Sequence, residues 1–104
     1  MTTQTVKSGD TATIYTSTLL KDGAVQDLTG ATVVMLLQIG TTQTSIAATV
    51  VSASAGTVSC TPGSSMPTAA GTYKQEWEVT FSGGTKLTFP NSGYNYIIIE
   101  DDLN

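Results

Sequence analysis

Apolar and polar residues alternate along much of this chain, and the alternation is cleanest between Thr72 and Phe81. There the odd-numbered positions hold mainly aromatic and aliphatic residues, including Tyr73 and Trp77, whereas the even-numbered positions hold charged or hydroxylated ones. Side chains of a β-strand point alternately to its two faces, so this period of two predicts a strand with one face buried and one in water. Tyr73 and Trp77 are therefore expected in the core.

Turn residues divide the chain into seven segments of this kind, and Asp22-Gly23, Pro62-Gly63 and Gly83-Gly84 are the main turn signals. The predicted strands span residues 11–20, 31–39, 45–52, 57–61, 72–81, 86–89 and 94–100. No segment has the period of 3.6 residues that indicates a helix. Because 104 residues suit one domain, we expect a single all-β domain over residues 1–104, either a sandwich or a small barrel.

A local motif favours the sandwich. Ala70-Gly71-Thr72-Tyr73 precedes a predicted strand as the tyrosine corner does in immunoglobulin-like domains, where the Tyr hydroxyl bonds to upstream backbone. In that pattern a cysteine follows two residues after the tyrosine, and this chain has Gln75 there. The predicted fold is thus a single immunoglobulin-like antiparallel β-sandwich of about seven strands, without the inter-sheet disulfide. We expect the Tyr73 hydroxyl to donate to a backbone carbonyl within residues 66–70.

The predicted strands 31–39 and 94–100 are apolar on both faces, although an antiparallel strand normally offers polar residues to water. Such an outward apolar row is typical of a contact surface. We therefore expect a partner interface at Val34, Leu36, Ile97 and Ile99, unless a loop or the N-terminal arm covers these residues. The expected core comprises Val33, Met35, Leu37, Val58, Cys60, Tyr73, Trp77, Val79 and Ile98.

Composition and charge exclude several functions. Thr supplies 20 residues and Ser 10, which favours strands and turns. The net charge is −4, with four Lys and no Arg, so neither nucleic acid nor an anionic membrane surface is an expected partner. The single cysteine, Cys60, allows no intrachain disulfide and favours folding in a reducing cytosol. Residues 1–10 lack the apolar run of a signal peptide, and no run of 18 apolar residues predicts a membrane span.

Catalytic chemistry has few candidate residues here. The chain has no His, the commonest general base and a common zinc ligand. Glu76 and Glu78 share one strand face, and we interpret them as a solvated face rather than a catalytic pair. Glu100, Asp101 and Asp102 are interpreted as a solvated tail rather than a calcium site. We expect no catalytic residue, no cofactor and no metal site, and hence no enzyme.

Aromatic residues leave an alternative open. Trp77, Tyr94 and Tyr96 would form a sugar-binding platform if their rings were exposed together, because aromatic faces stack on sugars. The pattern favours Trp77 as a core residue and does not decide between core and surface for the two tyrosines. A carbohydrate-binding or host-surface-binding module is therefore the alternative to a protein that binds other proteins.

Several motifs together resemble one family. The segments 27–33, 70–81 and 88–94, together with Gly9-Asp10-Thr11 and Leu20-Lys21-Asp22-Gly23, resemble the immunoglobulin-like N-terminal domain of phage baseplate upper proteins and of related small phage structural proteins. The resemblance implies a bacteriophage virion protein that folds in the host bacterial cytoplasm and contacts other virion proteins. It also implies either a symmetric homo-oligomer or several copies in the particle. It brings no catalytic residues, and it leaves the position open among baseplate, neck, tail, head fibre and capsid decoration.

Overall fold

Extended strands form nearly all of the regular structure in the computed structural model, which describes residues 3–90 and 93–101. Within these residues there is no α-helix, and one 3₁₀ turn, η1 (Gly63–Ser65), is the only helical element. The strands are β1 (Thr3–Lys7), β2 (Tyr15–Thr18), β3 (Leu20–Lys21), β4 (Ala24–Val25), β5 (Thr32–Ile39), β6 (Thr42–Ser52), β7 (Thr57–Cys60), β8 (Gly71–Thr80), β9 (Lys86–Phe89) and β10 (Asn95–Glu100). The chain is therefore all-β, as its alternation predicts.

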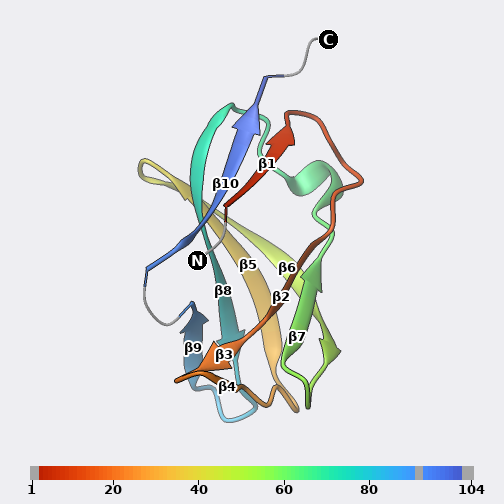
Figure 1. The fold of residues 1–104 in the computed structure, drawn as a ribbon, viewed down its shortest axis with the longest axis vertical. Helices are drawn as coiled ribbons and strands as arrows, with labels where there is room; N and C mark the ends of the chain where they lie inside the picture. Colours follow the sequence, from red (N-terminus) through yellow and green to blue (C-terminus); the bar gives the residue numbers. More distant parts are fainter. Residues whose placement is uncertain (1–2, 91–92, 102–104) are drawn as a thin grey trace.

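Seven strands follow one another in a single curled sheet, in the order β1-β10-β8-β5-β6-β7-β2 (Figure 1). β9 also pairs with β8, beside the end of that strand that β10 leaves open, and β3 and β4 form a separate hairpin. The sheet is mixed, because β1 runs parallel to β10 while the other neighbours are antiparallel. The strong curl brings β2 round to face β8 and β10, so the sheet forms a half-barrel.

The long strand β6 explains why there are not two clearly separate sheets. Its residues 42–48 pair with β5, and its residues 49–52 pair with β7, with an irregularity in register between Val50 and Ser52. One strand thus turns the corner that a sandwich would leave between two layers. The all-β class expected from the sequence is confirmed. In place of a clear antiparallel sandwich of two sheets, the strands form one curled, mixed sheet.

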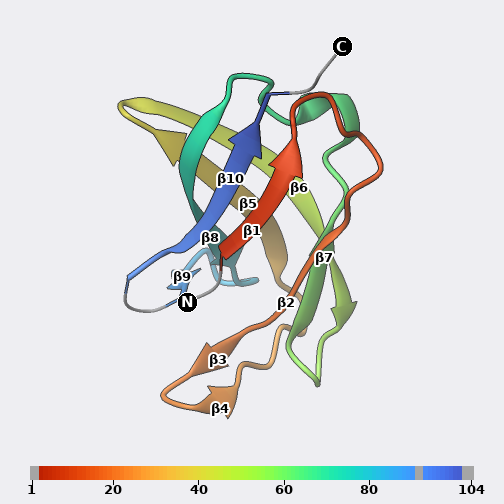
Figure 2. The ribbon, with the colours of Figure 1, turned by 45° about the horizontal axis from the view of Figure 1, so that its top comes forward.

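Each of the seven predicted segments overlaps a strand of the structure. The alternation did not predict strand β1 or the β3–β4 hairpin. β1 has one half-buried side chain, Val6, and is held by backbone pairing with β10, so its sequence carries little apolar signal. The β3–β4 hairpin turns at Asp22-Gly23 and projects from the body in Figure 2. Its paired residues Leu20 and Val25 are both exposed, so no buried face marks these strands.

The core fills the concave side of the half-barrel. Eight of the nine residues expected there are buried: Val33, Met35, Leu37, Val58, Cys60, Tyr73, Trp77 and Val79. Met35 and Val79 are fully enclosed, and Trp77 lies between strand neighbours Met35 and Phe89. Leu28, in the link between β4 and β5, closes one end of this core.

The expected orientation of β10 is wrong by one residue. Ile97 and Ile99, expected at a partner interface, are 3% and 2% exposed, whereas Ile98, expected in the core, is half-buried. Directly paired residues of neighbouring strands point to the same face. Because Ile97 pairs with the inward Tyr73, the register of β10 on β8 turns Ile97 and Ile99 into the core.

The loop before β8 carries the predicted tyrosine hydrogen bond. The Tyr73 hydroxyl donates to the backbone carbonyl of Ala69 over 2.7 Å. This carbonyl lies within the segment 66–70 where the acceptor was expected, so the prediction is confirmed. The bond joins the beginning of β8 to the loop that follows η1.

Candidate functional site

The side of β5, β8 and β10 that faces away from the core is the first candidate, and we call it the outer face. Cross-strand register aligns its rows: Leu36 of β5 pairs with Glu76 of β8, and Lys74 of β8 pairs with Tyr96 of β10. The outer face comprises Val34, Leu36 and Gln38 of β5, Lys74, Glu76 and Glu78 of β8, Tyr96 and Ile98 of β10, and the adjoining Tyr94. Apolar and charged side chains therefore alternate across this surface.

Apolar side chains on the outer face keep part of their surface in solvent. Val34, Leu36 and Ile98 are half-buried, while Tyr94 is 37% exposed. The N-terminal strand does not lie over them, because β1 extends the edge of the sheet beside β10 instead. Val34 and Leu36 thus remain candidate contact residues, and Ile98 takes the place expected for Ile97 and Ile99.

Charged groups on the outer face are unequally paired. Glu78 forms an ion pair with Lys86 at 3.8 Å, and the Lys74 ammonium lies 4.6 Å from the centre of the Tyr94 ring. Glu76 has no salt bridge in residues 3–90 and 93–101. Partial burial raises the pKa of Glu76, the neighbouring Glu78 raises it further, and Lys74 opposes both effects.

Glu76 and Glu78, which the sequence indicates as a solvated strand face rather than a catalytic pair, both lie on the outer face. They lie on the side of β8 opposite Trp77, and one of them is paired with Lys86. The groove described next opens on the other side of β8. The two carboxylates are therefore not brought together with the groove.

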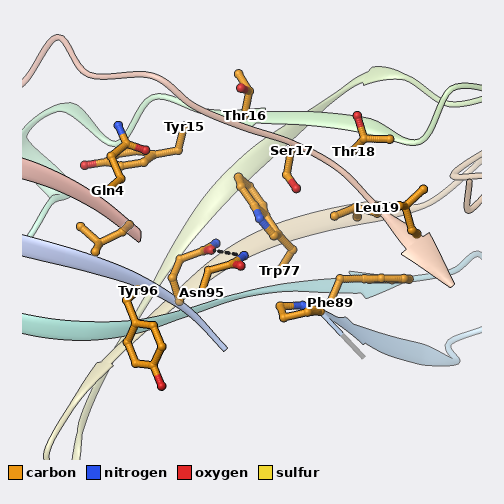
Figure 3. A pocket seen from close by; sticks show the side chains of 14 residues that line it. Gln4, Tyr15, Thr16, Ser17, Thr18, Leu19, Trp77, Phe89, Asn95 and Tyr96 are labelled. Carbon is orange, nitrogen blue, oxygen red and sulfur yellow. Dashed lines mark hydrogen bonds between the residues drawn. The ribbon is translucent and has the colours of Figure 1, made fainter. Parts of the chain in front are cut away.

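A groove of about 420 Å³ lies on the concave side, between β2 and the strands β8, β9 and β10 (Figure 3). Hydroxyl groups of Thr16, Ser17 and Thr18 border one side, and the amides of Gln75 and Asn95 border the other. Asn95 Nδ2 donates to Gln75 Oε1 over 3.0 Å, so the two amides hold each other in place. None of the lining residues carries a charge.

The aromatic residues of the alternative sugar-binding platform do not meet in this groove. Trp77 is 2% exposed and offers no face for stacking, and Phe89 beside it is equally buried. Figure 3 shows the Tyr96 ring turned to the opposite side of the ribbon from Trp77. Tyr94 lies with Lys74 instead. The three aromatic rings are therefore divided between the core and the outer face.

Cys60 is buried and donates its thiol weakly to the Ala47 carbonyl over 3.5 Å, and burial raises its pKa. No group of three His, Cys, Asp or Glu side chains suited to a metal occurs among residues 3–90 and 93–101. The expected tail of Glu100, Asp101 and Asp102 is described only as far as Asp101, and Asp102 lies outside the described residues. The described part of the chain also contains no helix of the length and hydropathy that crossing a bilayer requires.

No protein-family model matches the chain, and no curated protein sequence matches it.

Sequence reasoning missed two arrangements of side chains. The grouping of Lys74 with Tyr94 and Tyr96 depends on the register of β10, which the alternation of Tyr96, Ile97, Ile98 and Ile99 leaves open. The amide pair of Gln75 with Asn95 joins residues 20 positions apart. One signal in the sequence pointed to this pair: Gln75 is a polar residue in an otherwise apolar inward row, so its amide needs a hydrogen-bond partner.

Proposed function

We propose that this protein is a structural component of a bacteriophage particle and acts by binding other virion proteins. The observation that carries the proposal is the outer face, where Val34, Leu36 and Ile98 lie half-buried on a sheet surface that would otherwise be polar. Tyrosine is enriched in protein interfaces, and the fully buried centre of an interface is more apolar than the rest of a protein surface. The resemblance to baseplate upper proteins supplies the virion context.

The proposal includes the finer fold. We interpret the half-barrel as an immunoglobulin-like domain in which β6 joins the two layers. The hydrogen bond from Tyr73 to the Ala69 carbonyl supports this interpretation, because it reproduces the tyrosine corner of such domains. A buried, unpaired Cys60 supports folding in the reducing cytoplasm of the bacterial host before assembly.

An incorporation experiment tests the function. The wild-type chain and a Leu36→Ser/Ile98→Ser variant are produced in the host together with the remaining particle proteins, and purified particles are analysed for the chain. We expect the wild type in the particles and the variant in the soluble fraction. Val51→Ser is the matched control, because Val51 is 63% exposed but lies on β6, away from the outer face.

Two results would contradict the proposal. Particles that form normally and lack the wild-type chain would exclude a virion role. Normal incorporation of the Leu36→Ser/Ile98→Ser variant would remove the outer face as the contact surface. Fluorescence of Trp77, the one tryptophan of the chain, reports whether each variant is folded.

A further inference from the structure

The outer face has a charge pattern that is complementary to itself. Along β8 the outward residues run Thr72, Lys74, Glu76, Glu78 and Thr80, so a cation and an anion stand on either side of Gln75. Glu78 is neutralised by Lys86, whereas Lys74 and Glu76 have no salt bridge in the described residues. Lys74, whose ammonium lies over the Tyr94 ring, and Glu76, whose carboxyl feels the Lys74 charge, thus form no salt bridge within the described residues, on a surface that also carries apolar side chains.

We infer that the outer face binds a second copy of this chain, face to face about a two-fold axis level with Gln75. The inference rests on the proposed function, because it names the partner of the same surface. A two-fold contact joins the same patch of both copies, so each pair of residues occurs twice. With the axis lying between the sheets and perpendicular to the strands, Lys74 of each copy stands opposite Glu76 of the other.

Neighbouring rows of the outer face fit the same axis. Leu37, Gln75 and Asn95 lie level with one another across β5, β8 and β10, so the axis follows this row. Tyr96 lies level with Lys74, and Leu36 lies level with Glu76. The axis therefore carries Tyr96 of one copy to the level of Glu76 in the other, next to β8 at the middle of the contact.

The spacing of packed sheets and the burial of Glu76 are consistent with this contact along β8, the middle strand of the convex outer face. Sheets packed face to face lie about 10 Å apart, a distance that a lysine and a glutamate side chain span together. Glu76 is half-buried, so its carboxyl is already partly withdrawn from water. Opposite charges in such a setting mainly provide specificity, since they exclude arrangements in which like charges meet.

Charge reversal tests the inference without removing any apolar contact. Sedimentation equilibrium over a concentration series should show the wild type approaching twice its monomer mass of 10.8 kDa. Lys74→Glu and Glu76→Lys should each weaken self-association by about 10-fold or more, because each variant sets like charges against each other. The double variant Lys74→Glu/Glu76→Lys should restore it, because the reversed pairs are complementary again.

Mixing gives the sharpest result. Copies with Lys74→Glu and copies with Glu76→Lys should associate with each other although neither associates with itself. Lys21→Glu is the matched control for net charge and should have little effect, because Lys21 is exposed on the β3–β4 hairpin, away from the outer face, and forms no salt bridge within the described residues. If a reversal unfolds the domain, as read from Trp77 fluorescence, Lys74→Gln or Glu76→Gln replaces it and should still weaken self-association.

The inference is overturned if the wild type stays monomeric, if the single variants associate as strongly as the wild type, or if the mixture does not pair. The proposed function is tested separately. A monomeric chain that is incorporated into particles, and is lost from them with Leu36→Ser/Ile98→Ser, would keep the virion role and assign the outer face to a different protein.

Discussion

Gly56 is a position where adding one methyl group should destabilise the fold strongly. It is buried in the turn between β6 and β7, and it has a φ of +67°. A Cβ placed there would lie 2.8 Å from the Gln26 carbonyl oxygen, 2.8 Å from Val25 Cγ1 and 3.2 Å from the Leu19 carbonyl oxygen. Leu19 in turn donates its backbone N–H to the Gly56 carbonyl over 2.8 Å. The turn and the base of the β3–β4 hairpin are therefore in direct contact.

The magnitude follows from three contributions. A left-handed φ costs an L-residue about 1–2 kcal/mol, and the loss of freedom in the unfolded chain returns about 0.4–1 kcal/mol on replacing Gly by Ala. Overpacking against backbone atoms that are fixed by hydrogen bonds adds about 1–3 kcal/mol. We expect Gly56→Ala to lower the free energy of unfolding by about 2–4 kcal/mol. In a domain of this size each kcal/mol lowers Tm by about 4–8 °C.

Gly40→Ala separates the backbone contributions from the overpacking. Gly40 has a φ of +57° in the turn between β5 and β6, but a Cβ there would meet no atom within 4 Å. Its substitution should cost about 1 kcal/mol or less, from backbone strain alone. Urea unfolding followed by Trp77 fluorescence measures both variants. Equal losses of stability would refute the argument, because they would show that the contact with the hairpin contributes nothing.

Two further changes test individual groups in the same assay. Tyr73→Phe should lower the free energy of unfolding by about 1 kcal/mol, because the Ala69 carbonyl loses its donor; unchanged stability would show that water replaces the hydroxyl at no cost. Glu76→Gln should stabilise the domain near neutral pH, since the raised pKa of Glu76 in the folded state means that stability falls as pH rises through that pKa. The difference from wild type should disappear in acid, where Glu76 is protonated in both states, and a difference that persists there would contradict this explanation.

The alternation of β8 was informative because its two faces differ in chemistry. Aromatic and aliphatic residues on one side and charged residues on the other leave one orientation that buries apolar surface, so Tyr73 and Trp77 could be placed in the core from the sequence. The acceptor of the Tyr73 hydroxyl could be predicted because the upstream loop is close in sequence. Both are local arguments, and local arguments hold where neighbouring residues contain the whole pattern.

β10 shows where such reasoning ends. Tyr96, Ile97, Ile98 and Ile99 are apolar on both faces, so either orientation buries a similar amount of apolar surface. Pairing of Ile97 with Tyr73, 24 residues earlier in the chain, selects the orientation that was not expected. The prediction was therefore wrong for Ile97 and Ile99, which are half of the expected interface. Val34 and Leu36 do point outward, because the orientation of β5 was predicted correctly.

The sequence by itself determined the all-β class, the limits of seven segments, most of the core and the lack of His and Arg for chemistry. Only the tertiary structure decided that β6 pairs with both β5 and β7 within one curled sheet, that β1 pairs parallel with β10, and that Lys74 and Glu76 lie on a surface with the two tyrosines. The physical reason is the range of the interactions. Alternation and turn signals are written in consecutive residues, whereas curl, register and the meeting of distant side chains depend on pairing between strands far apart in the chain.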